Sequence, residues 1–185
     1  QPWVDLLRRH VQPSEWQSIE AAWLKPLARL LPDLAILRPE LKPEQDADNE
    51  VPQTQFFEAL HQVLLNLASR QRVVLFVDGA QWGDEATYAA LVYLLERDFF
   101  NKNGLLILAV RPQESNPALE KLRNASNAGR SLTTIDMQPL NLDEIAQVAR
   151  SVLGQAPTQQ LAFRLKMDSG GNPYYLLELL YALQD

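Results

Sequence analysis

The chain has 185 residues, of which 46% are hydrophobic and 22% charged, a composition typical of a globular protein and not of a collagen-like, disulfide-rich or disordered one. The net charge of −6, from 17 basic and 23 acidic residues, argues against a broad basic surface for nucleic acid. The sequence has no cysteine, so it forms neither a disulfide nor a thiolate metal site, and it lacks the apolar run of about 18 residues that a membrane span needs. We expect a cytoplasmic protein that neither enters a membrane nor binds nucleic acid directly.

The first fifty residues predict helices followed by a loop. Residues 3–12 carry apolar side chains at helical spacing, and Ser14 is a plausible N-cap of a second helix that Pro26 should kink or interrupt. Residues 38–52 contain three prolines and many acidic side chains, which favours a long loop. Three tryptophans of the predicted helices are expected in the core: Trp3, Trp16 and Trp23.

The middle of the chain alternates predicted helices and strands. Residues 53–68 have the wide apolar face of a helix, and the run RVVLFVD at residues 72–78 is typical of a strand buried on both faces of a parallel sheet. Four elements follow: a helix capped by Asp84, a second buried strand at 105–110, a helix at 116–127 and a third strand at 132–137. This alternation predicts a parallel α/β sheet with right-handed crossovers.

After Pro139 the pattern predicts helices alone. They begin at Asn141 or Asp143, at Thr158 and at Pro173. We therefore expect an α/β fold in two parts, a partial nucleotide-binding domain at residues 1–138 and a small helical subdomain at residues 139–185. The two histidines lie far apart in predicted helices, at His10 and His61, where surface roles are expected and a metal site is not.

Two polar residues follow the predicted strands at the edge where open α/β sheets bind ligands. Asp78 ends the first strand in the Walker B pattern, and its carboxylate could hold Mg²⁺ beside a nucleotide. Arg111 follows the second strand, and its guanidinium suits a phosphate. From the pattern alone the alternatives stay open: Asp78 as an ordinary loop aspartate, and Arg111 as the partner of a nearby carboxylate.

Longer segments carry a family resemblance. VVLFVDGAQWGDEATYAALVYLL, LLILAVRPQE and SGGNPYYLLELL together resemble the nucleotide-binding domain of the signal-transduction ATPases with numerous domains (STAND), an AAA-type group. The ATPase regions of large bacterial transcriptional activators and of adenylyl-cyclase-associated regulators are the most similar in appearance. The resemblance covers most of the chain from about Gln53 onward. In that family an aspartate pair, a histidine or glutamine and a tryptophan end the Walker B strand, which Asp78, Gln81, Trp82 and Asp84 match.

The resemblance implies roles for individual residues. Asp78 would coordinate Mg²⁺, and Arg111, followed by Pro112, would sense the γ-phosphate of ATP. The glycine-any-proline turn of the family matches Gly171, Asn172 and Pro173, which would touch the adenine from a helical lid. Tyr174 and Tyr175 are expected to pack the lid helix, with stacking of one on a base as the alternative.

Two departures from the family qualify these roles. The sequence contains no G-x-x-x-x-G-K-S/T, the Walker A loop that cradles phosphates, and we expect the chain to begin after it. Gly79 stands where the family has its second Walker B acid, and a glycine can neither take a proton nor align a water. We assign no catalytic residue, and we expect ATP or ADP with Mg²⁺ in the intact parent but neither on this chain alone.

Two functions remain as alternatives. The first is a fragment of an ATP/ADP-dependent switch in a bacterial transcription regulator, whose DNA-binding and sensor modules lie elsewhere in the same polypeptide. The second is a degenerate ATPase fold that serves as a protein-interaction module, which Gly79 favours. Self-association is compatible with both. Direct DNA binding by this segment is disfavoured by the charge and by the lack of a recognisable helix-turn-helix.

Overall fold

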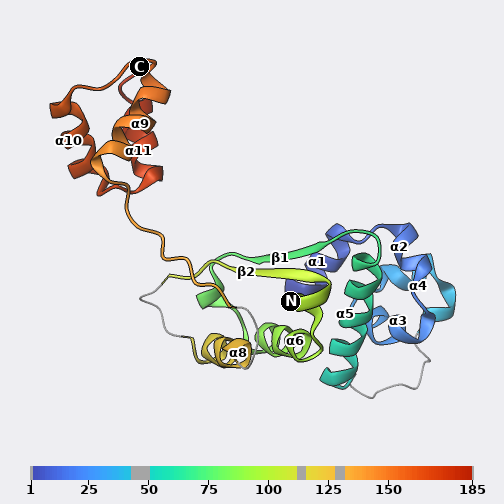
Figure 1. Ribbon diagram of the computed structural model, residues 1–185. Coiled ribbons are helices and arrows are strands. Elements are labelled where there is room, and N and C mark those ends of the chain that lie inside the picture. The colour runs from blue at the N-terminus through green and yellow to red at the C-terminus, as the bar shows by residue number, and fades with distance from the viewer. Residues whose placement is uncertain (1, 43–50, 112–115, 128–131, 185) are drawn as a thin grey trace. The chain divides into compact units, whose positions relative to one another are not determined.

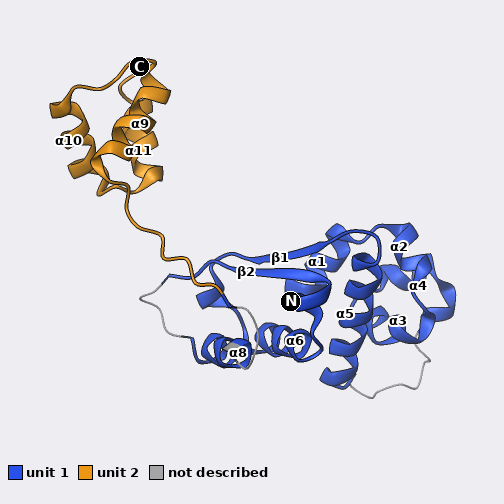
Figure 2. Ribbon diagram, in the orientation of Figure 1, with its two compact units in different colours: residues 1–132 blue, residues 133–185 orange. Residues whose placement is uncertain are grey.

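A computed structural model describes residues 2–42, 51–111, 116–127 and 132–184. The chain divides into two compact units, residues 1–132 and residues 133–185 (Figure 2). Each unit has its own hydrophobic core, so each is described by itself. Among the described residues, no helix is long and apolar enough to cross a membrane.

The first unit begins with short helices. They are α1 (Pro2–His10), α2 (Pro13–Ser18), α3 (Ala21–Ala28), α4 (Asp33–Leu37) and the 3₁₀ turn η1 (Pro39–Leu41). The predicted cap at Ser14 is wrong, because α2 begins earlier and is closed by a capping box between Gln12 and Glu15. The interruption expected at Pro26 lies instead at the extended residues Ile19 and Glu20, and Pro26 sits inside α3.

The centre of the first unit is a two-stranded parallel sheet (Figure 1). The helix α5 (Gln53–Ala68) leads into β1 (Val73–Val77), which pairs in register with β2 (Gly104–Leu108). Between the strands lie η2 (Ala80–Trp82), α6 (Glu85–Glu96) and α7 (Phe99–Lys102), and α8 (Pro117–Asn127) follows β2. The first two of the three predicted strands, their parallel pairing and the helices that follow each of them are therefore confirmed.

One face of this sheet packs into the core and the other does not. Leu75 is buried, and Val73, Val77, Leu106 and Leu108 pack against the same cluster as the inner faces of α5 and α6. The alternate residues remain between 42% and 60% exposed: Val74, Phe76, Leu105 and Ile107. The expectation that both strands are buried on both faces is therefore wrong. The sequence shows how apolar a strand is but not whether a layer covers each of its faces.

The third predicted strand is absent. Residues 132–137 form no strand, and all six are exposed. In the described part of the chain only β1 and β2 pair, and LTTIDM, despite its β-forming side chains, is added to neither of them. A strand requires a ladder partner, which local propensity does not supply.

The second unit is a small three-helix cluster. It consists of α9 (Leu142–Leu153), α10 (Gln159–Ser169) and α11 (Pro173–Tyr181), packed around Ile145, Ala149, Leu165, Leu176 and Leu180. Of the two predicted starts for α9, the structure selects Asn141, whose side chain accepts from the backbone N–H of Glu144. The N-cap of α10 is Thr158, as predicted.

Candidate functional site

The loop after β1 presents Asp78 at the carboxyl edge of the sheet. Asp78 is exposed, and the next residue, Gly79, lies in the left-handed region with φ 60° and ψ 41°. The chain then forms η2 and turns into α6, whose N-cap is Asp84, as predicted. Hydrogen bonding by Thr87 lowers the pKa of the Asp84 carboxyl, and the backbone N–H of Thr87 is 2.6 Å from Asp84 Oδ1. The Asp84 carboxylate therefore serves as the N-cap of α6, whereas Asp78 is exposed to solvent.

Arg111 lies at the same edge of the sheet, just beyond β2. The ladder continues past both strands, because the N–H of Ala109 donates to Val77 O and the N–H of Ala80 donates to Ala109 O, each at 2.9 Å. Arg111 is exposed. Pro112, its partner in the predicted sensor pair, lies outside the described residues. Parallel pairing thus brings Asp78 and Arg111 to one edge, as the sequence predicts.

Two amide side chains join the loops that carry these residues. Gln81 is 7% exposed, and its Oε1 accepts a hydrogen bond from the backbone N–H of Arg111 at 3.2 Å. Asn116 Nδ2 donates to the carbonyl oxygens of Gln81 and Gly83 at 2.9 and 3.2 Å. Gln81 is buried and Asn116 is partly buried, and since buried amides need hydrogen-bond partners, these contacts restrain the two loops relative to each other.

The carboxyl edge of the sheet carries two charged side chains, those of Asp78 and Arg111. Within the described residues, the side chains of Asp78 and Arg111 make no hydrogen bond or ion pair with other side chains, so a carboxylate and a guanidinium remain free for a ligand. A carboxylate fits Mg²⁺ and a guanidinium fits a phosphate oxygen. The described residues hold no cluster of three or more metal-binding side chains, and the sequence has no phosphate cradle. These residues therefore fit one side of a Mg²⁺–nucleotide complex.

Comparison with known proteins identifies the family. A family model described as the AAA ATPase domain matches residues 2–108, which is more than half of the chain and includes both strands of the sheet. The chain belongs to the AAA ATPase domain family. No curated protein and no solved structure matches the chain. Membership supports a nucleotide-dependent function in general terms.

The matched region of this AAA ATPase domain ends before the glycine-any-proline turn, which lies in the second unit. There Gly171 has φ 79°, its N–H donates to Ser169 Oγ at 3.0 Å, and its carbonyl accepts from the N–H of Leu140 at 2.8 Å. Asn172 caps α11 by accepting from the N–H of Tyr174 at 2.9 Å. Gly171 is buried and Asn172 caps α11, so both have architectural roles, while the exposed members of the turn are Asn172 and Pro173.

Aromatic residues near this turn differ from expectation. Tyr174 and Tyr175 are 67% and 57% exposed and contact each other edge to face, with ring centroids 5.7 Å apart. The prediction that they pack the lid helix is wrong, because the buried stripe of α11 is formed by Leu176 and Leu180.

The tryptophans expected in the core of the first unit follow the prediction in part. Trp3 and Trp16 are buried as predicted, but Trp23 is 37% exposed.

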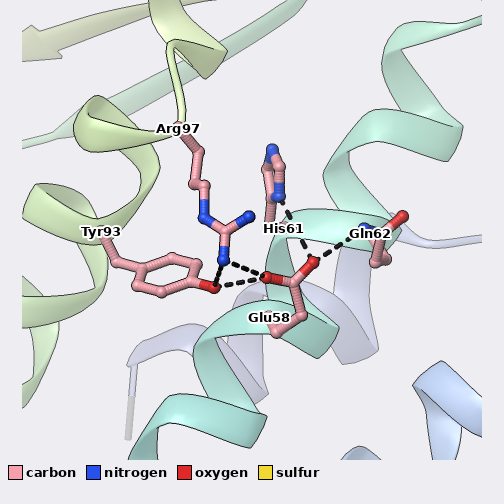
Figure 3. A network of polar contacts seen from close by, with 5 residues as sticks. All are labelled: Glu58, His61, Gln62, Tyr93 and Arg97. Atoms are coloured by element: carbon pink, nitrogen blue, oxygen red, sulfur yellow. Dashed lines mark hydrogen bonds and ion pairs between the residues drawn. The ribbon is translucent and has the colours of Figure 1, made fainter.

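A second polar cluster joins α5 to α6 (Figure 3). Glu58 Oε2 accepts from the Tyr93 hydroxyl and lies 3.0 Å from the Arg97 guanidinium, while Oε1 accepts from Gln62 Nε2 at 2.8 Å. Burial alone would raise the pKa of the Glu58 carboxyl, but the hydrogen bonds from Tyr93 and Gln62 and the charge of Arg97 hold that pKa below its usual range.

His61 belongs to the same cluster and is buried, so the surface role expected for it is wrong. Its Nδ1 lies 3.8 Å from Glu58 Oε1 and has no hydrogen-bond partner. Burial lowers the pKa of His61, and the negative charge of Glu58 offsets only part of that effect. The imidazole of His61 also contacts the ring of Phe99 edge to face, and this contact contributes to its apolar surroundings.

Sequence reasoning did not assign roles to Gln81 or Asn116. The Asn-Pro pair before α8 signals a helix cap, and Asn116 Oδ1 does accept from the N–H groups of Ala118 and Leu119 at 2.9 and 3.3 Å. Its contact with the loop after β1 spans more than thirty residues, and no local pattern indicates it.

Proposed function

We propose that residues 1–132 are the Walker B and sensor half of an ATP/ADP-dependent switch, completed by a P-loop strand and helix outside this sequence. The uncovered face of the parallel sheet carries the proposal. Val74 pairs with Leu105 and Phe76 with Ile107, which gives four exposed apolar side chains on neighbouring strands. Parallel sheets are normally covered on both faces, so this face is suited to a further layer of the same domain.

The position of the free residues supports the same assignment. Asp78 would hold Mg²⁺, and Arg111 would contact the γ-phosphate, since both lie exposed at the carboxyl edge. A P-loop strand beside β2 would supply the missing phosphate cradle. It would also give residues 132–137 a strand with which to pair.

For the second unit we propose the role of a lid. Gly171, Asn172 and Pro173 form the turn at the start of α11, and Pro173 would rest against the adenine. Order or docking of the lid would then depend on which nucleotide is bound, a two-state element biased by ligand contacts. The bacterial transcription regulator with DNA-binding and sensor modules in the same polypeptide is the context that the STAND resemblance suggests.

Calorimetry tests the proposal in two polypeptides. The 185-residue chain should show no tight binding of Mg²⁺–ATP, since most phosphate contacts of such sites come from the P-loop. A longer polypeptide with a P-loop unit ahead of Gln1 should bind it, and Arg111→Ala should weaken ATP more than ADP, by the factor of roughly 10–100 expected of a charge-assisted contact. Micromolar affinity of the short chain, or equal losses for the two nucleotides, would contradict the proposal.

One observation favours the second candidate, a protein-interaction module. Gly79 stands at the position of the family's second Walker B acid, so this chain lacks the carboxylate that would align a water for hydrolysis. The backbone of Gly79 lies in the left-handed region, which by itself favours a glycine. A switch that binds nucleotide and hydrolyses it slowly should gain turnover in the longer Gly79→Asp polypeptide, by the ~10²–10⁴ of a positioned acid–base group. A longer polypeptide that binds no nucleotide would favour the interaction module.

A further inference from the structure

Gln81 is a buried polar residue whose hydrogen bond reaches across the sheet edge. Its side chain is 7% exposed, and Oε1 accepts from the backbone N–H of Arg111, thirty residues further along the chain. A buried amide without a partner is unfavourable, so this bond orients the Gln81 side chain and restrains the Arg111 backbone. The contact leaves the Arg111 guanidinium free.

Asn116 extends the connection to a helix. Its Nδ2 donates to the carbonyls of Gln81 and Gly83, and its Oδ1 accepts from the first N–H groups of α8. A single amide thus binds the loop after β1 on one side and caps α8 on the other. Since Gln81 is held in turn to Arg111, three segments are joined by side-chain amides: residues 78–84, Arg111 and the start of α8.

We propose that Gln81 and Asn116 are positioning residues. Gln81 fixes the backbone of Arg111, from which the guanidinium reaches a phosphate, and Asn116 connects the loop after β1 to α8. The sensor part of this inference rests on the proposed nucleotide-binding function. The connection links the Arg111 backbone to the start of α8 through two side chains.

The chemistry defines which residues can replace Gln81. The position requires a hydrogen-bond acceptor that can be buried. A neutral histidine has an acceptor nitrogen and satisfies this requirement, whereas leucine is of similar size and has none.

Amide hydrogen exchange on the 185-residue chain tests the positioning directly. In Gln81→Leu, exchange at the Arg111 amide should rise about tenfold, the effect of one net hydrogen bond, while the amides of Leu60 and Leu64 in the core of α5 stay protected. Gln81→His should restore protection at Arg111. Unchanged exchange at Arg111 in Gln81→Leu, or no restoration by histidine, would overturn the role of Gln81.

Asn116→Asp is a second variant with a sharper chemical contrast. The carboxylate still accepts from the N–H groups of Ala118 and Leu119, but it no longer donates to the carbonyls of Gln81 and Gly83. Exchange at Arg111 should therefore rise severalfold while the amides of α8 keep their protection. Loss of protection throughout α8 with no change at Arg111 would mean that Asn116 is only a helix cap.

Nucleotide discrimination in the longer polypeptide tests the sensor part. Gln81→Leu should lower the preference for ATP over ADP by about fivefold or more, Gln81→His should restore it, and the double variant with Arg111→Ala should lose no more than Arg111→Ala alone. Normal discrimination in Gln81→Leu, with discrimination lost in Arg111→Ala, overturns this inference alone. Absence of nucleotide binding overturns the proposed function and the sensor part together, and the exchange result then decides the positioning by itself.

Discussion

The carboxylate of Glu58 on α5 accepts a hydrogen bond from the hydroxyl of Tyr93 on α6. The same carboxylate oxygen lies 3.0 Å from the Arg97 guanidinium, which also lies over the Tyr93 ring at 5.0 Å from its centroid. Burial and the hydrogen bond to Glu58 both raise the pKa of Tyr93, which keeps its hydroxyl a donor. This cluster joins two helices that flank β1 in sequence and pack in one core.

Removing the Glu58 carboxylate should destabilise the first unit. In Glu58→Ala, the hydroxyl of Tyr93 and the amide of Gln62 lose their acceptor in a half-buried setting, which should lower the free energy of unfolding by about 1–3 kcal/mol. Urea unfolding followed by tryptophan fluorescence measures this unit alone, since all four tryptophans lie before residue 83.

Glu120→Ala is the matched control for that measurement. Glu120 pairs with Arg123 at 3.3 Å, but both side chains are exposed to solvent. Its removal should change the free energy of unfolding by less than about 0.5 kcal/mol. Equal effects of the two substitutions would mean that the Glu58 cluster contributes no more than a surface ion pair.

The stability of the first unit should fall on acidification. Burial lowers the pKa of His61 from 6.5, so below that pH the unfolded chain takes up a proton that the folded chain does not, and folding weakens. The Glu58 carboxyl, whose pKa lies below 4.5, adds a second loss as the pH falls through its folded value. Fluorescence-detected urea unfolding at a series of pH values from 7.5 down to about 3 measures both steps.

His61→Gln separates the two contributions. This variant should lack the first decline, below about pH 6.5, and retain the one at lower pH. His10 is an exposed histidine on α1, so His10→Gln should leave the decline of the native chain in place. A flat profile between pH 7 and pH 5 in the native chain would show that His61 takes up its proton equally in the folded and unfolded states.

Gly79 should resist replacement for a backbone reason. Its φ of 60° lies in the left-handed region, and a Cβ there would meet only Trp82 Cδ1, at an ordinary 3.5 Å. Gly79→Ala should therefore cost about 1–2 kcal/mol from conformation alone, and Gly79→Asn less, because asparagine tolerates this region better. Thermal melts of the two variants test the order. Equal melting temperatures for glycine and alanine would show that the turn relaxes without strain.

Gly171 and Gly170 form a natural pair for separating backbone strain from crowding in the second unit. Both have positive φ, but a Cβ at Gly171 would lie 2.6 Å from Leu140 O and from Lys166 Nζ, whereas Gly170 has open space. Gly170→Ala should cost about 1 kcal/mol, and Gly171→Ala roughly 3 kcal/mol, because the backbone at Leu140 must also move.

Native-state amide exchange at Ile145 and Leu165 follows the stability of this unit, which contains no tryptophan. The two amides should exchange much faster in Gly171→Ala than in Gly170→Ala. Similar acceleration by the two substitutions would indicate that Leu140 and Lys166 shift freely and that φ alone matters.

Much of this architecture was determined by local sequence patterns. The β-branched run at residues 72–78 gives β1, Asp84 and Thr158 cap α6 and α10, and the order of helices and strands follows from their periodicities. The placement of Asp78 and Arg111 also follows from the sequence. Each residue comes after a strand, and the carboxyl ends of neighbouring parallel strands lie at the same edge of the sheet.

Tertiary structure decided what depends on neighbours. Residues 132–137 have strand-forming side chains but pair with neither β1 nor β2, and Phe76 is exposed because no layer of the described residues lies over its face of the sheet. His61 is buried because Phe99 and Glu58 surround it, and Gln81 reaches Arg111 only because the two strands lie side by side. Burial and long-range hydrogen bonds are properties of pairs of segments, so the pattern within one segment does not contain them.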